Sequence, residues 1–351
     1  MKTGKSLTEL AQALTEQAQA SRDFIVPTAE IASKDGELAF QGKSFGLNNW
    51  SHGQLAGYAE VPKQYADRIR SENVALYDQN INHGLAKKKD DTRMIRTVSN
   101  STRAVLSPRY ERGMSSYNIL NESLLPPMLK HGFKPLSMEL TDKRCYLKAI
   151  NPNAKAMVAG KKVFFGMSWS NSDVGAGANN LDFFMYQSFC LNGLVFGMNS
   201  FRKVHIGRNL AGDGYQELLS NDTHALTAKA VNAQMNDVLG AVCQPDFFKS
   251  QVEKYEASAE RQIENTDLKE VIELTMQKVG LTGKDNAQGI LASLANPASG
   301  GNGLTQWGLA NAVTYWAHKA PDISYENSDN LERAGGSILE LSNSQWAKIA
   351  A

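Results

Sequence analysis

The order of hydrophobic and polar positions along the chain predicts a helical start, a strand-rich middle and a helical end. Ser6 and Glu9 have the spacing of a capping box, and leucines follow at helical intervals, so we expect an amphipathic helix as far as Ser21. A second helix is expected over residues 62–70, where a proline occupies the first turn and apolar residues share one face. The chain therefore begins with helices whose apolar faces must pack against another part of the protein.

Short strand-like runs dominate the middle of the sequence. They fall at residues 93–99, 102–106, 135–140, 144–150 and 162–170. A helix over residues 115–131, closed by Gly132, interrupts them. In the clearest strand, 144–150, a period of two separates a basic and aromatic face from a core face. We therefore predict an α+β fold with a small, mainly antiparallel sheet, helices packed on one face, and a helical C-terminal region.

A polar, turn-rich segment follows the last of these strands, with the sequence SNSDVGAG at residues 170–177. Apolar residues then recur at helical spacing from Phe183 to Leu194, which predicts a buried helix. Beyond Gly212 the pattern is helical, with a linker expected at 298–303 before a final helix. We divide the chain into a helical N-terminal region, a basic α+β core domain and an acidic helical C-terminal region, at residues 1–80, 81–210 and 211–351.

Charge is distributed unevenly, although the net charge is only +1. Residues 1–80 carry 8 basic and 10 acidic side chains, residues 81–208 carry 19 and 8, and residues 209–351 carry 10 and 18. A basic block between acidic flanks indicates a surface for polyanions, because neutralising phosphates supplies most of the affinity of proteins for nucleic acid. The alternative is that these charges spread over all faces and pair with the acidic flanks.

Several protein classes are excluded by what the sequence lacks. Residues 1–15 have no continuous apolar stretch or cleavage site of a secretion signal, and no run is long enough for a membrane helix. The three cysteines lie far apart, which is typical of a protein from the reducing cytoplasm. No sequence motif for a metal, a nucleotide or a catalytic serine is found, so we expect no cofactor and no metal.

Two further constellations have ordinary structural interpretations. Cys190 with His205 has the residue types of a thiolate pair, but Cys190 falls on an apolar stripe, which favours core packing. The glycines of 175–177 share part of a phosphate-binding turn, but the third glycine of that motif is missing, and a structural turn is the favoured interpretation.

Basic and aromatic residues are interleaved throughout the middle third. Residues 201–208 alone place four potentially cationic side chains around a glycine. A groove for single-stranded nucleic acid needs cations for the backbone and aromatic rings for unpaired bases. The predicted binding residues are Arg93, Arg96, Arg103, Arg109, Arg144, Tyr146, Lys148, Lys161, Lys162, Trp169, Arg202, Lys203, His205 and Arg208.

Several segments of the sequence together resemble a known family. They lie at residues 93–97, 106–110, 170–177, 184–193, 202–208 and 307–315. These segments, which span roughly residues 45–345, resemble a widespread phage and plasmid-like family of unknown function, with the SNSxVGAG run as its specific motif. The resemblance implies a mobile element in a bacterial host. By analogy of fold alone, the chain is similar to RecT-like and Red-beta-like single-strand annealing proteins.

Three hypotheses follow from these observations. The first is a cytoplasmic protein that binds single-stranded DNA and promotes strand annealing or recombination as a homo-oligomer, without nucleotide hydrolysis. Its acidic C-terminal region would then contact a host or phage replication or recombination protein. The second is an enzyme acting on a nucleotide or nucleic acid, with Asp173 and His205 as acid and base. The third is a protein that interacts with a host factor.

Overall fold

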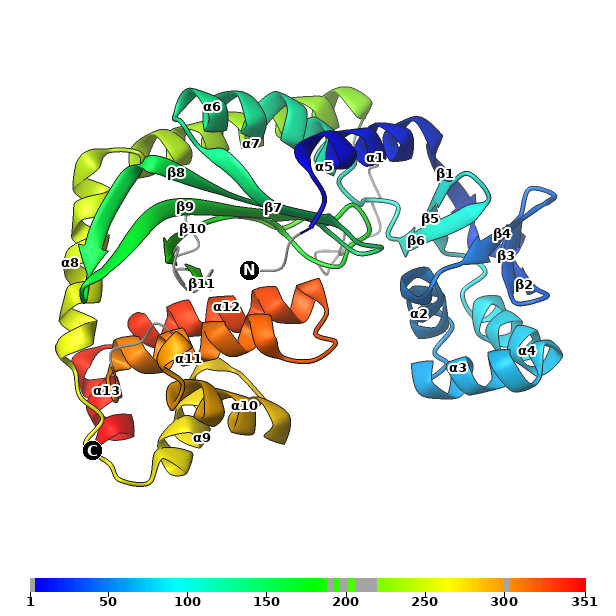
Figure 1. Cartoon of the computed structure of the whole chain (residues 1–351). Helices are drawn as coiled ribbons and strands as arrows, with labels where there is room; N and C mark the ends of the chain where they lie inside the picture. The colour runs from blue at the N-terminus through cyan, green and yellow to red at the C-terminus, as the bar shows by residue number, and fades with distance from the viewer. Residues whose placement is uncertain (1–3, 188–191, 196–200, 206–219, 300–302) are drawn as a thin grey trace.

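The computed structural model describes residues 4–187, 192–195, 201–205, 220–299 and 303–351. These residues form an α+β protein with two β-sheets (Figure 1). The predicted class is confirmed. The helical C-terminal region, which the sequence also predicts, supplies a second layer of helices to the central sheet.

The first sheet is mixed and combines segments from both sides of residue 80. Its strands run in the order β1 (Ser21–Pro27), β5 (Thr92–Val98), β6 (Ser101–Leu106), β4 (Lys43–Leu47), β3 (Glu37–Phe40) and β2 (Ala32–Lys34). The pair β4 and β6 is parallel, and the other neighbours are antiparallel. A 3-10 turn and three helices pack with this sheet around a shared apolar core: η1 (Thr28–Glu30), α2 (Asn49–Tyr58), α3 (Lys63–Glu72) and α4 (Val74–Ala86).

The second sheet is antiparallel and lies at the centre of the molecule. Its strands run in the order β11 (Asn192–Val195), β10 (Asn179–Gln187), β9 (Lys161–Asn171), β8 (Cys145–Val158) and β7 (Lys134–Leu140). A short strand, β12 (Phe201–Lys203), pairs with the beginning of β10. Odd-numbered residues such as Leu147, Phe165 and Phe183 point into the main core, as the period of two requires.

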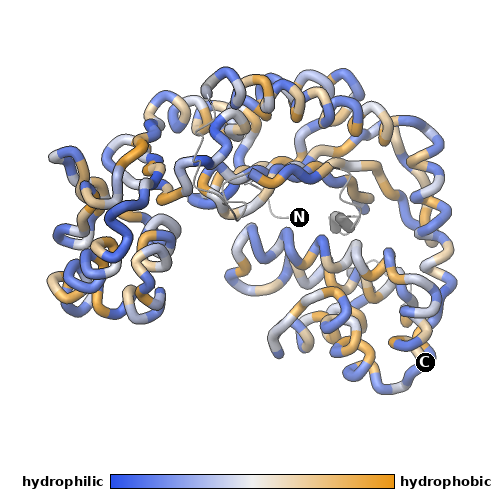
Figure 2. Tube along the Cα trace, turned by 180° about the vertical axis from the view of Figure 1, so that it is seen from behind, coloured by the Kyte–Doolittle hydropathy of each residue, from blue (hydrophilic) through white to orange (hydrophobic). Residues whose placement is uncertain are grey.

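Helices cover both faces of the second sheet (Figure 1). The first layer consists of α1 (Leu7–Ala20), α5 (Ser116–Asn118), a π-helical turn (Ile119–Leu124), α6 (Leu125–Lys130) and α7 (Asn221–Val242), with α8 (Pro245–Glu260) along its side. The C-terminal region contains α9 (Leu268–Val279), α10 (Lys284–Leu294), η3 (Pro297–Ser299), α11 (Gln306–Lys319), α12 (Tyr325–Leu339) and α13 (Asn343–Ala350). Of these, α11 and α12 lie below the sheet, and the flanking helices mix hydrophobic and hydrophilic positions, as amphipathic helices do (Figure 2).

The sequence predicts the opening helix, the helix near residues 62–70, the strands from residue 93 to 170 and the helical C-terminal region. It misses the strands β1 to β4, so the N-terminal region 1–80 is not purely helical, and the buried helix predicted from residue 183 is wrong. The opening helix carries the expected capping box at Ser6, and the predicted strands are present. Residues 183–187 instead continue β10, and almost every residue of that strand is buried. A strand covered on both faces has a continuous apolar run without alternation, so its pattern resembles a buried helix. Cys190 lies outside the described residues.

The even-numbered face of the second sheet is polar near its middle and is closed by α12. Lys148 of β8 is 2% exposed, lies 2.8 Å from Asp329 and also pairs with Glu332. Arg333, one residue further along α12, bridges Asp329 and Asp182 of β10. Burial opposes the charged form of Lys148, but the two carboxylates outweigh it and raise its pKa. The basic face predicted for strand 144–150 is therefore an internal ion-pair network.

We predict that Lys148→Met destabilises the protein by about 3–5 kcal/mol, because it takes the lysine cation from buried Glu332 and leaves buried Asp329 paired with Arg333 alone. Chemical denaturation followed by circular dichroism measures the change. Lys162→Met, at an exposed position on β9, is the matched control and is expected to stay within about 0.5 kcal/mol of the wild type. Equal stability of both variants would show that the network does not hold α12 to the sheet.

Candidate functional site

The SNSDVGAG segment forms the turn between β9 and β10, at the end of the central sheet that meets the first sheet. Gly175 has a φ of 76°, and a Cβ there would lie 2.9 Å from a methyl carbon of Leu106. Gly177 packs against the guanidinium of Arg144, which donates to the carbonyl of Ala176 at 2.9 Å. Glycine is therefore required at Gly175 by its backbone conformation, whereas a side chain at Gly177 would displace the Arg144 guanidinium.

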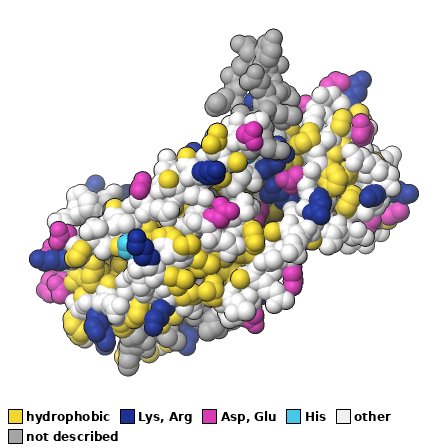
Figure 3. Space-filling model, turned by 90° about the horizontal axis from the view of Figure 1, so that it is seen from above, with side chains coloured by type: hydrophobic (Ala, Val, Ile, Leu, Met, Phe, Trp, Pro, Cys, Tyr) yellow, Lys and Arg dark blue, Asp and Glu magenta, His cyan; other side chains and the backbone are white. Residues whose placement is uncertain are grey.

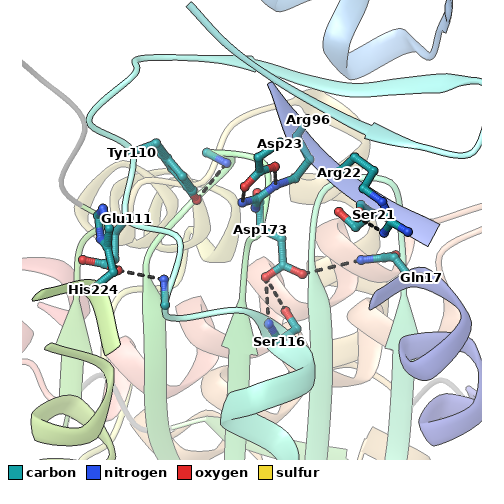
Figure 4. A network of polar contacts seen from close by, with 12 residues as sticks. Gln17, Ser21, Arg22, Asp23, Arg96, Tyr110, Glu111, Ser116, Asp173 and His224 are labelled. Carbon is teal, nitrogen blue, oxygen red and sulfur yellow. Dashed lines mark hydrogen bonds and ion pairs between the residues drawn. The ribbon is translucent and has the colours of Figure 1, made fainter. Parts of the chain in front are cut away.

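Asp173 lies at the centre of a polar network around this turn (Figure 4). Its Oδ1 accepts hydrogen bonds from the backbone N of Ser116 at 2.8 Å, from Ser116 Oγ at 2.9 Å and from Asn171 Nδ2 at 3.1 Å. Gln17 Nε2, from α1, lies 3.5 Å from its Oδ2. The carboxylate thus connects the turn to α1 and to the first residue of α5.

Arg96 connects the same turn to the first sheet. It faces Asp23 across the β1–β5 pair, and its Nε and Nη2 donate to the two carboxylate oxygens at 2.8 and 2.7 Å. Its Nη1 donates to the backbone carbonyl of Asp173. Arg96 is only 9% exposed, so this bidentate pair is a buried, charge-assisted contact.

Tyr110 and His205 pack together behind the turn. Their rings stack with centroids 5.2 Å apart, and Tyr110 Oη donates to the carbonyl of Ser172 at 2.8 Å. His205 Nε2 lies 2.9 Å from Asn171 Oδ1, while Asn171 Nδ2 contacts Asp173. Burial lowers the pKa of His205 to about 4, so the imidazole is neutral near pH 7.

A hollow of about 270 Å³ opens beside Asp173. Its lining combines α1, the first sheet, the segment before α5 and the turn: Leu14, Gln17, Ala18, Ser21, Arg96, Val98, Arg103, Arg112, Ser115, Tyr117, Asn118, Asp173 and Val174. Seen from above, Lys and Arg side chains gather in a depression between the two lobes of the molecule, beside acidic side chains (Figure 3). The lining therefore combines three arginines, one carboxylate and other polar side chains with apolar residues and one aromatic ring.

Two of the arginines in the hollow have hydrogen-bonding capacity left over. Arg103 donates to Gln17 Oε1 and, at 3.0 Å, to the carbonyl of Asp142. Its Nε and that of Arg112 are buried without a hydrogen-bond partner among the residues the structure describes. Burial also lowers the pKa of Arg103, which means that its charged form is poorly solvated. An anion in the hollow would relieve this cost.

The position of Arg112 is set by its neighbours on both sides. Glu111 Oε1 accepts from the backbone N of Gly113 at 2.8 Å and lies 2.9 Å from Nδ1 of His224 on α7. A Cβ on Gly113 would lie 2.4 Å from the carbonyl oxygen of His224. The chain around Arg112 is thus held against α7, and Arg112 lines the hollow.

The structure brings four of the predicted binding residues to this turn. Arg96 and Arg103 line the hollow, Arg144 packs on Gly177, and His205 contacts Asn171. Arg96 is largely committed to Asp23, and His205 is 8% exposed and does not line the hollow. Among these four residues, Arg103 is the best placed to meet a ligand.

Three predicted binding residues are buried in the interior, and their predicted contact with nucleic acid is corrected here. Tyr146 packs against Tyr325 of α12, and Lys148 belongs to the ion-pair network beneath the sheet. Trp169 is 0% exposed and donates through Nε1 to Asn179 Oδ1 at 2.8 Å. These side chains are inaccessible to solvent because the C-terminal helices cover one face of the sheet and the main core covers the other.

The remaining predicted residues lie apart from the hollow's lining. Arg93 stacks over Tyr58, with the guanidinium carbon 3.8 Å from the ring centroid, and Arg109 is half-buried. Lys161 and Lys162 lie at the start of β9, while Arg202 and Lys203 are on β12, which pairs with the beginning of β10. These two pairs occupy opposite ends of the central sheet, about 25 Å apart along the strand. Arg208 lies outside the described residues.

Sequence reasoning missed several residues of the network. Arg112 belongs to the basic block, so charge counting was the available signal for it. Gln17 and Asp23 lie outside that block, and nothing in the sequence connects them to Asp173, about 150 residues away. Tyr110 and Ser116 act through packing and backbone contacts, which composition does not show.

Other kinds of site were sought in the described part of the chain. No group of three or more His, Cys, Asp or Glu side chains there is arranged to hold a metal ion. Within the same ranges, no helix combines the length and hydropathy that a bilayer crossing requires. A wider cavity of about 1160 Å³ lies between the α9–α10 turn, α11 and α12, and its lining mixes Asn, Asp and Gly residues with apolar side chains, Trp316 and Arg333.

We predict that His205 makes the protein less stable in acid. The unfolded chain binds a proton near pH 6.5, whereas the buried imidazole does so only near pH 4, so the free energy of unfolding falls as the pH drops through this window. The slope due to one residue is at most about 1.4 kcal/mol per pH unit. Denaturation of His205→Gln should show a shallower pH dependence, whereas His83→Gln, at an exposed position, should keep the wild-type slope.

Comparisons with known proteins assign no function to this site. No protein-family model, no curated protein and no solved structure matches the chain. The resemblance to a phage and plasmid-like family therefore stays a prediction, and the residues around Asp173 carry the functional argument.

Proposed function

We propose that the protein binds single-stranded DNA and promotes strand annealing or recombination without nucleotide hydrolysis, with the hollow beside Asp173 as its phosphate contact. The observation that carries the proposal is the convergence of Arg96, Arg103 and Arg112 on one hollow. Guanidinium groups bind phosphate oxygens in bidentate geometry, which suits them to this role better than a point charge.

The charge pattern supports the same function. The basic excess of residues 81–208 is only partly used inside the protein, in pairs such as Arg96 with Asp23 and Lys148 with α12. Arg202 and Lys162 remain exposed and add to the positive potential, which speeds the association of a polyanion with the protein. Binding of this kind weakens steeply with salt.

A stacking surface is also present at the hollow. Tyr117 lines it and is half-buried, which leaves part of the ring accessible. Tyr146 and Trp169, which the sequence suggests for base stacking, are buried, so we assign this role to Tyr117. Stacking on an aromatic ring leaves the hydrogen-bonding edge of a base free, which annealing of a second strand requires.

An enzyme acting on a nucleotide or nucleic acid is the second candidate. It is favoured by the hydrogen-bonded series Asp173, Asn171 and His205, which resembles an acid–base relay. We rank it second because the Asp173 carboxylate already accepts several hydrogen bonds and His205 does not reach the hollow. Loss of turnover in Asp173→Asn with DNA affinity intact would reverse this order.

We predict that Arg112→Gln weakens binding of single-stranded DNA and lowers the slope of log affinity against log salt by about 0.7, the loss of one phosphate contact. Fluorescence anisotropy with an oligonucleotide of about 20 nucleotides measures both effects. Arg103→Lys, which keeps the charge but loses the forked geometry, should weaken binding without a large change of slope.

Arg68→Gln is the matched control, because it removes one positive charge from the exposed face of α3, away from the hollow. It should leave the affinity nearly unchanged. Affinity of the wild type that does not change between about 50 and 200 mM salt would contradict the proposed function.

A further inference from the structure

Gln17 is a polar residue on the core-facing side of α1. At intervals of three and four residues, this side of the helix carries Leu7, Leu10, Leu14 and Gln17. Leu10 and Leu14 are buried in the main core, whereas Gln17, in the last turn of the helix, lines the hollow beside Asp173. Because the leucines fix the helix, a change at the hollow can involve the Gln17 side chain without movement of α1.

The Gln17 amide occupies a hydrogen-bond donor that a phosphate group would use. Its Oε1 accepts from Nη1 of Arg103, and its Nε2 lies 3.5 Å from Oδ2 of Asp173 (Figure 4). Arg103 also donates from Nη2 to the carbonyl of Asp142, while its Nε has no hydrogen-bond partner among the residues the structure describes. Within those residues, Gln17 is the side-chain acceptor of this guanidinium, and a side chain can rotate away where a backbone carbonyl cannot.

A phosphate group is a stronger acceptor for Arg103 than this amide is. The amide is neutral and presents one oxygen, whereas a phosphate carries negative charge and presents two oxygens to the forked guanidinium. The other end of the amide is held weakly, because 3.5 Å is long for an N–H···O hydrogen bond. Gln17 is also half-buried, so part of its side chain already contacts solvent. Displacing the amide therefore costs little compared with the contact that replaces it.

We infer that Gln17 is a gate residue: its amide caps Arg103 in the free protein, and an incoming phosphate group displaces it. The inference rests on the proposed binding of single-stranded DNA and adds a contact that regulates the same site. An internal acceptor that competes for Arg103 lowers the affinity for a strand, which favours release of the strand once it has annealed. The residue type matters, because a carboxylate at position 17 would neutralise Arg103, whereas an amide leaves its charge available.

Gln17→Ala removes the competing amide and should bind single-stranded DNA about three- to tenfold more tightly than the wild type, because one donor of Arg103 is then free. The slope of log affinity against log salt should stay the same, since the amide carries no charge. Fluorescence anisotropy with an oligonucleotide of about 20 nucleotides measures both quantities. Gln12→Ala makes the same change on the exposed side of α1, where the Gln12 amide donates to Glu16, and should leave the affinity unchanged.

Gln17→Glu tests the inference in the opposite direction. The new carboxylate should pair with Arg103 and add a negative charge beside Asp173. This variant should therefore bind more weakly than the wild type, with the salt slope lowered by about 0.7, the loss of one phosphate contact. Affinity equal to that of the wild type would contradict the inference.

The outcomes separate the gate residue from the proposed function. If the wild type and Arg112→Gln differ in DNA affinity but Gln17→Ala binds no more tightly than the wild type, DNA binding stands and the inference is overturned. If the wild type shows no salt-dependent DNA binding, the proposed function is wrong, and inorganic phosphate then tests the gate residue alone. Phosphate should raise the thermal unfolding temperature of Gln17→Ala more than that of the wild type, and equal shifts overturn the inference. Thermal unfolding without ligand shows that each variant is folded.

Discussion

The buried guanidinium of Arg96 connects the two sheets of this protein, beside a small apolar cluster that includes Met94 and Val174. Arg96 forms a bidentate pair with Asp23 on the neighbouring strand of the first sheet and donates to the backbone of Asp173 in the turn of the second. A buried cation is tolerated only when its donors are satisfied, so the two sheets must meet where both acceptors are in reach. The same contact places Arg103, two strands from β1, at the wall of the hollow. The geometry of the candidate site thus depends on this internal ion pair.

Much of the fold follows from local patterns. The capping box at Ser6, the alternation along 144–150 and the glycine after the helix at 115–131 each reflect a local rule, and the structure contains the corresponding elements. The misassigned residues 183–187 show the limit of such rules. A strand buried on both faces loses its period of two, and what buries it comes from segments far away in the sequence. The residues at which helices and strands begin and end depend on the local sequence, whereas the burial of each element depends on segments far away in the chain.

The candidate site was only partly predictable for the same reason. Its SNSDVGAG turn is visible in the sequence because glycine and polar residues cluster there, and Arg96 and Arg103 are visible as charge. Charge counting gives the sign of a segment but not the partner of each side chain. In the sequence, Lys148 and Arg103 are both cationic residues of the basic middle third. In the structure, Lys148 forms ion pairs with carboxylates of α12, whereas Arg103 lines the hollow. Only the path of the chain in three dimensions separates a structural cation from one available to a ligand.

The ion pairs beneath the central sheet also have a consequence for the chain while it is being synthesised. During synthesis the strands β7 to β10 leave the ribosome long before α12. The ion-pair partner of Lys148 follows 184 residues later, and that of Asp182 follows 151 residues later. Until then one side of the sheet is an open surface with an aromatic cluster around Phe184 and Tyr186. A nascent chain that stalls before α12 would expose that surface to chaperones or to other strands. The charged residues on it act as gatekeepers, because they disfavour edge-to-edge and face-to-face association while the protein is incomplete.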